Sequence, residues 1–395
     1  RLDHPQMWAE DGRNWYAEAH NEGFSTLFTP YAGYLHLLPR LLAWLAAAQR
    51  PASAAVAIYV LWVITQLWFA AIIWRRRAAI GICPAVLLVG LAGLAPYATE
   101  IHGNLTNLQW YGAPVLVVLA VAARTARLRW DEYATGLLLG LSGPIVGFVA
   151  IAEALQFALD RRRRDRTFTA LLTLCSCVFI VVLLASDRAP QGMAVSLLDD
   201  SMVVGWHVGI GGFLGIDTMI RVVDRIPVAA HRWIGSMVAA LLLYRSARGW
   251  RGRSEREHQA ALSRVALLVL LAVFLSPSTS DQPTALSEMM TPLYGSRYWF
   301  VPALAVKLEI ATLAWQRRTT LLAWLAAIGI AYGMLVDYHI GAYPNDAFMA
   351  ATVAYDTAPI GTRVTVPIWP PGWSMEVVKR PAGSSRGRER LHRPR

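Results

Sequence analysis

The sequence predicts an all-α fold, a polytopic transmembrane helix bundle. Hydrophobic residues make up 55% of the 395 residues and charged residues only 16%, whereas soluble domains carry about a quarter charged residues. Apolar runs of spanning or near-spanning length recur along the chain. The charges gather in short clusters between these runs, not on amphipathic faces, and this spacing is typical of membrane proteins.

The apolar runs set the expected number of membrane segments. Eight runs are clear, at residues 52–74, 80–95, 109–123, 168–185, 228–244, 260–276, 299–315 and 321–336. Together with shorter candidates they predict about nine to ten spanning or half-spanning segments. Because the chain starts on Arg1 and residues 1–8 have loop character, we expect a further transmembrane helix before residue 1.

Arginine clusters predict which side of the membrane each loop occupies. They lie in alternate loops, at residues 75–77, 124–129, 161–166, 245–256 and 317–318. By the positive-inside rule these loops are cytoplasmic. The same clusters account for the net charge of +11, and no aromatic-interleaved basic face is present, so nucleic acid is not an expected partner.

Two segments test this topology. Residues 133–159 carry arginine on both flanks, and Gly140-Leu-Ser-Gly-Pro144 interrupts them, so they predict two half-spanning helices that enter and leave on the cytoplasmic side. Residues 33–48 are short and contain His36, Pro39 and Arg40, which indicates an interfacial helix on the outer surface.

Three regions follow from this topology. Residues 1–51 form an outer first loop with juxtamembrane helices, and residues 52–336 form the transmembrane domain. Residues 337–395 form an outer C-terminal segment, with a small lid or hairpin near 364–378 and a basic, disordered tail from residue 379.

The adjacent acids Glu10 and Asp11 are the strongest candidates for chemistry. They lie in the outer loop, just before a short helical stretch. A carboxylate there can deprotonate an acceptor hydroxyl, or can hold a divalent cation beside a phosphate. The simpler alternative is an acid that caps the helix of residues 12–20.

The first fifty residues resemble the first outer loop of the GT-C superfamily of glycosyltransferases. The resemblance rests on the acidic pair, the juxtamembrane helix and the motif Thr29-Pro-Tyr-Ala-Gly-Tyr-Leu-His-Leu-Leu-Pro39-Arg40. It is closest to the bacterial branch of aminoarabinose transferases and protein O-mannosyltransferases. The resemblance implies a catalytic acid in this loop and a polyprenyl-phosphate sugar as donor. The family usually has Asp-Glu or Asp-Asp here, so Asp11 is the better candidate for the base than Glu10.

Arg297 is the candidate for the donor phosphate. It is the positive residue of the outer loop at residues 277–298 and precedes a helix, beside Tyr298. An arginine fork suits phosphate, although anchoring in lipid headgroups is an equal alternative. Lys307 and Glu309 lie within the following apolar run. Lys307 either reaches the lipid phosphate or pairs with Glu153.

Two further groups are candidates for sugar binding. The loop at residues 100–111 offers His102, Asn104 and Asn107 at a helix entrance, with helix capping as the alternative. His36 and Arg40 lie one turn apart on the surface helix, with headgroup anchoring as the alternative.

The predicted function is therefore that of a membrane glycosyltransferase in a bacterial plasma membrane, acting outside the cytoplasm in cell-envelope synthesis. The donor would be a polyprenyl-phosphate sugar and the acceptor a lipid, glycan or protein. No phosphate-binding loop, metalloprotease motif, nucleotide fingerprint or haem motif is present. The rivals are a transporter or lipid-linked-sugar flippase, favoured by the broken helix and by Lys307, and a structural membrane protein without chemistry.

Overall fold

The computed structural model of the chain describes residues 4–93, 102–159, 165–186, 197–248, 257–275, 295–316, 320–337 and 344–381, and is mostly helical. The helices before residue 160 are η1 (Asp11–Tyr16), α1 (Ala17–Glu22), η2 (Gly23–Phe28), α2 (Leu37–Ala46), α3 (Pro51–Arg75), α4 (Arg77–Ile80), α5 (Ile82–Gly93), α7 (Leu108–Thr125), α8 (Trp130–Gly140) and α9 (Ile145–Leu159). Those that follow are α10 (Arg166–Leu184), α11 (Leu197–Val204), η3 (Gly205–Gly211), α12 (Gly212–Leu214), α13 (Ile216–Val222), η4 (Val223–Arg225), α14 (Val228–Arg248), α15 (Glu257–Leu275), α17 (Ser296–Gln316), α18 (Leu321–Asp337) and α19 (Asp346–Thr357). Strands β1 (Arg363–Ile368) and β2 (Trp373–Val378) form an antiparallel hairpin.

All eight apolar runs form helices. Among the described residues, α3, α7 and α10 are long and apolar enough to cross a membrane, and the bent pair α8–α9 adds a fourth candidate. The outer faces of α3 and α10 remain largely unburied, as helices that face lipid require. The part of the chain that the structure describes therefore has three to four candidate spans by length and composition.

Helix α7 is the centre of the bundle. Its residues are buried on every side, from Leu108 to Ala123, and it contacts α3, α9, α15 and α17. An apolar helix without a polar face belongs in the core. The loop that precedes α7, at residues 102–107, therefore lies at one end of the bundle centre, against the N-terminal segment.

The predicted break at residues 140–144 is confirmed. Helices α8 and α9 are bent by 116° across it. Two acceptors at the break bind the start of α2. The carbonyl oxygen of Leu141 accepts from Leu37 N at 3.1 Å, and the side-chain hydroxyl of Ser142 accepts from Leu38 N at 2.8 Å. Two amides at the start of α2, which a helix cannot satisfy internally, are bonded in this way. The broken pair thus fixes where α2 begins.

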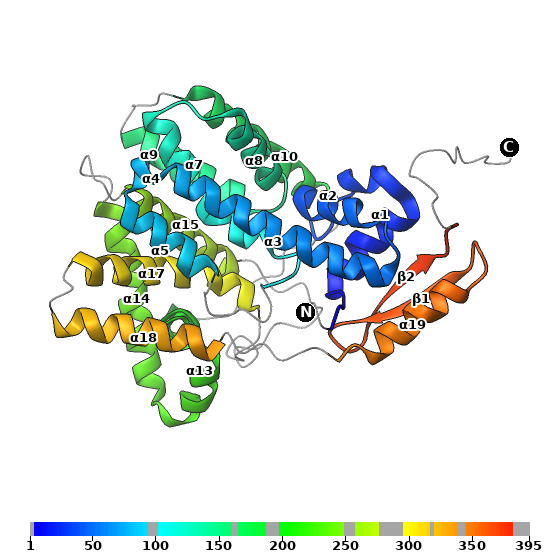
Figure 1. Cartoon of the computed structure of the whole chain (residues 1–395). Coiled ribbons are helices and arrows are strands. Elements are labelled where there is room, and N and C mark those ends of the chain that lie inside the picture. Colours follow the sequence, from blue (N-terminus) through cyan, green and yellow to red (C-terminus); the bar gives the residue numbers. More distant parts are fainter. Residues whose placement is uncertain are drawn as a thin grey trace.

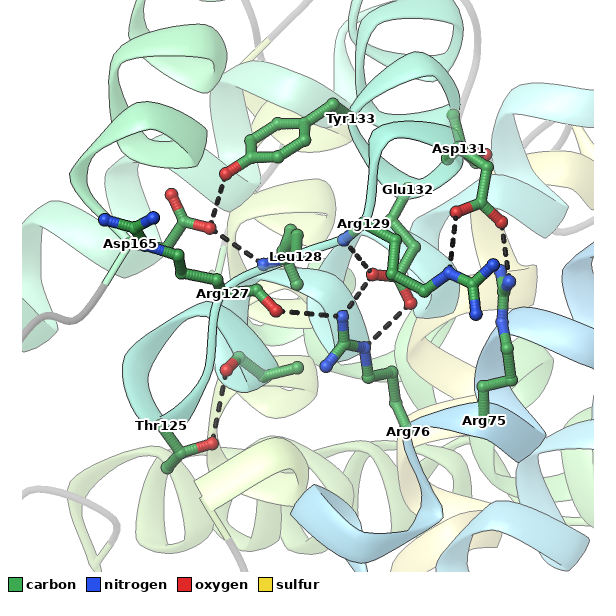
Figure 2. Close-up of polar contacts among 12 residues, drawn as sticks. Arg75, Arg76, Thr125, Arg127, Leu128, Arg129, Asp131, Glu132, Tyr133 and Asp165 are labelled. Carbon is green, nitrogen blue, oxygen red and sulfur yellow. Dashed lines mark hydrogen bonds and ion pairs between the residues drawn. The ribbon is translucent and has the colours of Figure 1, made fainter.

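The opposite end of the bundle collects two of the predicted arginine clusters (Figure 2). Arg75 pairs with Asp131 at 2.6 Å, and Arg76 Nε donates to Glu132 at 2.8 Å. Asp165, at the start of α10, accepts from Leu128 N and from the Tyr133 hydroxyl. The clusters at 75–77 and 124–129 therefore lie at the same end of the bundle, joined by acids of α8 and α10.

The C-terminal segment packs against the N-terminal one. Figure 1 shows α19 and the hairpin beside α1 and α2, at the end of α3 where that helix begins. Ala9 N donates to Trp369 O at 2.5 Å and Trp369 N donates to Met7 O at 3.1 Å. The extended segment predicted near residues 364–378 is confirmed as this hairpin. The tail at 382–395 and the loops at 160–164 and 276–294 lie outside the described residues.

One prediction about the fold is wrong. Residues 187–227 lie between the apolar runs at 168–185 and 228–244, and this spacing predicts a loop, yet helical turns run from Leu197 to Arg225. Glycines at 205, 209, 211, 212 and 215 obscure the helical pattern. Gly205 and Gly235 are present because the backbones of two helices touch there, leaving a Cβ on Gly235 only 1.4 Å from Ser201 O. At Gly205 and Gly235, close packing of the two helices, not turn formation, requires glycine.

Candidate functional site

Asp11 is buried at the N-terminal end of α7, against the loop at residues 102–107. It begins the π-helical turn η1 and its side chain is 1% exposed. Its Oδ2 accepts from Leu105 N at 2.8 Å, and its Oδ1 accepts from Thr106 N at 2.9 Å and from Thr106 Oγ1 at 2.7 Å. The carboxylate therefore binds the loop before α7. The alternative that it caps the helix of residues 12–20 is wrong.

The hairpin packs against η1 beside Asp11. A Cβ placed on Gly12 would lie 2.8 Å from Cδ1 of Ile368, so glycine allows this close approach without a shift of the Ile368 side chain. Because Gly12 follows Asp11 directly, the hairpin holds the backbone of η1 against the loop that bonds the carboxylate.

Burial raises the pKa of Asp11 to about 7, against the opposing effect of the three hydrogen bonds. The nearby charge of Glu10 adds to the increase. Desolvation disfavours the charged form of a carboxyl group, whereas donors favour it. A base with a pKa near the working pH is suited to accept a proton during catalysis.

Four rings, those of Trp15, Tyr31, Tyr34 and His36, form an aromatic wall between Asp11 and α2. Ala32 and Gly33 adopt positive φ angles of 52° and 86°, and Tyr31 and Tyr34 exchange backbone hydrogen bonds across them. This two-residue turn brings both tyrosines to the His36 ring, whose centroid lies 5.8 Å and 4.4 Å from theirs.

Three charged residues, Arg40, Arg297 and Glu10, act on this wall. Burial, and then the charges of Arg40 and Arg297, lower the pKa of His36 to about 3, so the ring is neutral at physiological pH. Burial and Glu10 raise the pKa of Tyr31, while Arg297 opposes them. Arg297, half-buried and 5.2 Å from the Tyr298 ring centroid, thus lies within electrostatic range of the Asp11 side of the fold.

Arg40 supports the wall from within. It is 2% exposed, donates to Glu18 at 2.7 Å and lies 4.7 Å from the Trp15 ring centroid. A guanidinium on an indole face is a favourable cation–π contact. Because its charge is paired with Glu18 and stacked on Trp15, Arg40 is part of the packing and does not face a headgroup.

The loop before α7 contributes structure as well as polar groups. Asn104 and Asn107 are fully buried, and Asn104 Oδ1 accepts from Asn107 N at 3.0 Å. The Tyr111 hydroxyl lies 3.0 Å from Nε2 of His102. These side chains shape the loop that bonds Asp11. Tyr298 packs edge-on against Trp110, with ring centroids 5.5 Å apart, and so joins the start of α17 to the same end of α7.

Lys307 is apart from this group. It lies ten residues after Arg297 on α17, about 15 Å along the helix axis, and is buried. The predicted pairing with Glu153 is wrong, because Glu153 binds Arg124, with Nε at 3.2 Å. Glu309 pairs with Arg245 at 2.8 Å. Local helix geometry could not reveal these partners, which come from other helices.

Sequence reasoning missed Trp15, Thr106, Tyr31 and Glu18. Trp15 is completely buried and donates from Nε1 to Thr106 Oγ1 at 2.8 Å. The two residues are 91 positions apart, so no local pattern links them. Aromatic residues close to the acidic pair were the available signal.

Within the described residues, no group of three or more His, Cys, Asp and Glu side chains is arranged to hold a metal ion. Comparisons with protein-family models, with curated proteins and with solved structures find no match for this chain. Its function must therefore be argued from the site itself.

Proposed function

We propose that this chain is a membrane glycosyltransferase that moves a sugar from a polyprenyl-phosphate donor to an acceptor hydroxyl on the non-cytoplasmic side. The observation that carries the proposal is the buried Asp11 carboxylate, with its pKa raised to about 7, beside a wall whose His36 and Tyr31 are within electrostatic range of Arg297. The resemblance of the first loop to GT-C glycosyltransferases supports it.

The proposed topology follows from the arginine clusters. Helices α5, α14, α15, α17 and α18 join α3, α7, α10 and the two half-spanning helices α8 and α9 inside the membrane, giving ten spanning or half-spanning segments. The end that carries Arg75 and Arg76 faces the cytoplasm. The first loop, the start of α17 and the C-terminal hairpin then face outward, where lipid-linked sugars replace nucleotide sugars as donors.

The reaction is a single displacement. The acceptor hydroxyl gives its proton to Asp11 while its oxygen forms a bond to the anomeric carbon. The bond from that carbon to the phosphate oxygen breaks, and the electron pair leaves with the polyprenyl phosphate. Arg297 offsets the negative charge that develops on the leaving phosphate. In the resembling family the anomeric configuration is inverted, and the same is expected here.

The transporter alternative gains from the confirmed break between α8 and α9, because discontinuous helices often form transport sites. The space at this break is already filled. Gln109 Oε1 would lie 1.5 Å from a Cβ on Gly143, and the neighbouring carbonyl and hydroxyl bond α2. A break occupied by protein groups favours a structural role.

The test is sugar transfer in membranes that contain the chain, supplied with a panel of radiolabelled polyprenyl-phosphate sugars. Asp11→Asn is expected to reduce transfer by about 100-fold or more, the usual contribution of a general base. Arg297→Ala is expected to lower the rate and raise the KM for donor. Glu22→Gln, an exposed acid of the same loop, is the control and should leave transfer unchanged. Full transfer by Asp11→Asn would exclude the proposed mechanism.

A further inference from the structure

When Asp11 is ionised, the hydroxyl of Thr106 has only one arrangement of hydrogen bonds open to it. Its Oγ1 lies 2.8 Å from Nε1 of Trp15 and 2.7 Å from Oδ1 of Asp11. An indole N–H can only donate, so Oγ1 accepts from Trp15. The single hydroxyl proton is then directed to Asp11.

The indole ring of Trp15 is held in one orientation by its neighbours. It is completely buried, with His36 at 4.6 Å and Tyr31 at 5.3 Å between ring centroids. The Arg40 guanidinium lies 4.7 Å from its ring centroid. The aromatic wall and the Arg40–Glu18 pair therefore hold the indole in the orientation that fixes the Thr106 hydroxyl.

The two oxygens of Asp11 are consequently unequal. Oδ1 accepts two hydrogen bonds, from the amide and the hydroxyl of Thr106, whereas Oδ2 accepts one, from Leu105 N. A carboxylate oxygen accommodates about two donors. The remaining acceptor position is on Oδ2.

We infer that Trp15 and Thr106 are positioning residues that make Oδ2 of Asp11 the proton-accepting atom and set its basicity. This inference rests on the proposed function. In the transfer step the acceptor O–H bond breaks and its proton forms a bond to Oδ2, while Oδ1 keeps both bonds to Thr106. The sugar then passes from the phosphate oxygen to the acceptor oxygen, as described above.

The inference predicts the direction of a titration. Donors to the ionised carboxylate favour that form and hold its pKa down. Thr106→Val removes the hydroxyl donor and keeps the branched shape. The pKa of Asp11 should therefore rise by about one unit, and the acidic limb of the pH–rate profile should move up by the same amount. Thr106→Ser retains the donor and should restore the wild-type profile.

Trp15→Phe provides an independent perturbation. It keeps an aromatic ring in the wall and removes the indole N–H, so the Thr106 hydroxyl is no longer forced to donate to Asp11. The acidic limb should shift in the same direction as in Thr106→Val, by a smaller amount. This variant tests the inference even if Thr106→Val fails to fold.

The experiment combines pH–rate profiles with a direct titration of Asp11, by 13C-aspartate NMR of the full chain in detergent, with Asp11→Asn identifying the signal. A raised pKa in Thr106→Val and Trp15→Phe, with a wild-type value in Thr106→Ser, supports the inference. An unchanged pKa in Thr106→Val, or a Thr106→Ser variant that behaves like Thr106→Val, overturns it. If the titration shifts as expected while Asp11→Asn still transfers sugar, the proposed function fails and Asp11 is not the base.

Discussion

Removal of the Glu132 charge tests how strongly the arginine-rich end of the bundle is held together (Figure 2). The side chain of Glu132 is 0% exposed and accepts from Arg76 Nε at 2.8 Å and from Arg129 N at 2.8 Å. Glu132→Gln keeps the size of the side chain and leaves the Arg76 guanidinium, only 15% exposed, without its buried counter-charge.

The expected cost follows from burial. Two unit charges about 4 Å apart attract by roughly 4 kcal/mol at an effective dielectric constant of 20. Removing one partner of a buried pair typically costs about 3–5 kcal/mol. Arg76 also donates to Arg127 O at 3.3 Å, which compensates part of the loss. We therefore expect Glu132→Gln to lower the free energy of unfolding by about 3 kcal/mol.

The chain supplies a matched control. Arg363 and Glu376 pair at 2.9 Å, almost the same distance, but their side chains are 69% and 55% exposed. Glu376→Gln should lower the free energy of unfolding by less than about 1 kcal/mol. Unfolding would be followed by circular dichroism during SDS titration in mixed micelles. Equal losses in the two variants would refute the argument that burial gives the Glu132 pair its strength.

The other predictions concern the site and its supports. Sugar transfer should fall as pH decreases through about 7, because the base must be ionised and the pKa of Asp11 is raised to about 7; initial rates from pH 5 to 9, in steps of about half a unit, measure this, and a profile flat across pH 7 would contradict it. Gly143→Ala should cost about 1–3 kcal/mol, since its Cβ would lie 1.5 Å from Gln109 Oε1, whereas Gly147→Ala, with its nearest side chain at 3.7 Å, should be neutral or stabilising; thermal unfolding in detergent compares the two, and equal midpoints would argue against a filled break. Deletion of residues 359–395 removes the hairpin that covers Gly12. It should make residues 7–21 sensitive to proteolysis and abolish sugar transfer. A truncated chain as protease-resistant as the full one would show that the hairpin is dispensable.

The sequence predicted the helices better than their partners. Each of the eight apolar runs forms a helix, and the Gly140–Pro144 interruption revealed the bend between α8 and α9, because both signals are local. Helices α11 to α13 were missed, since glycines required for close packing resemble loop residues. Chemistry alone leaves open whether Lys307 pairs with Glu153 or reaches a lipid phosphate, and in the structure Glu153 binds Arg124.

The candidate site was only partly accessible from sequence. The acidic pair stood out by its place in an outer loop, and the structure brings Asp11 together with His36, Asn104 and Asn107. The bonds between Asp11 and Thr106 span 95 positions. They form only when the first loop meets the start of α7, so no periodicity or motif spacing reports them.

The contact between the hairpin and the N-terminal segment has a consequence for biosynthesis. Residues 7–9 are synthesised about 360 residues before their backbone partner Trp369. Until the hairpin has reached the same side of the membrane, the turn that carries Asp11 lacks this contact. In the proposed topology, a chain with one helix inserted in the wrong direction would place the hairpin on the opposite side. Contact between the hairpin and residues 7–9 would then report that every intervening membrane helix of the proposed topology has been correctly inserted.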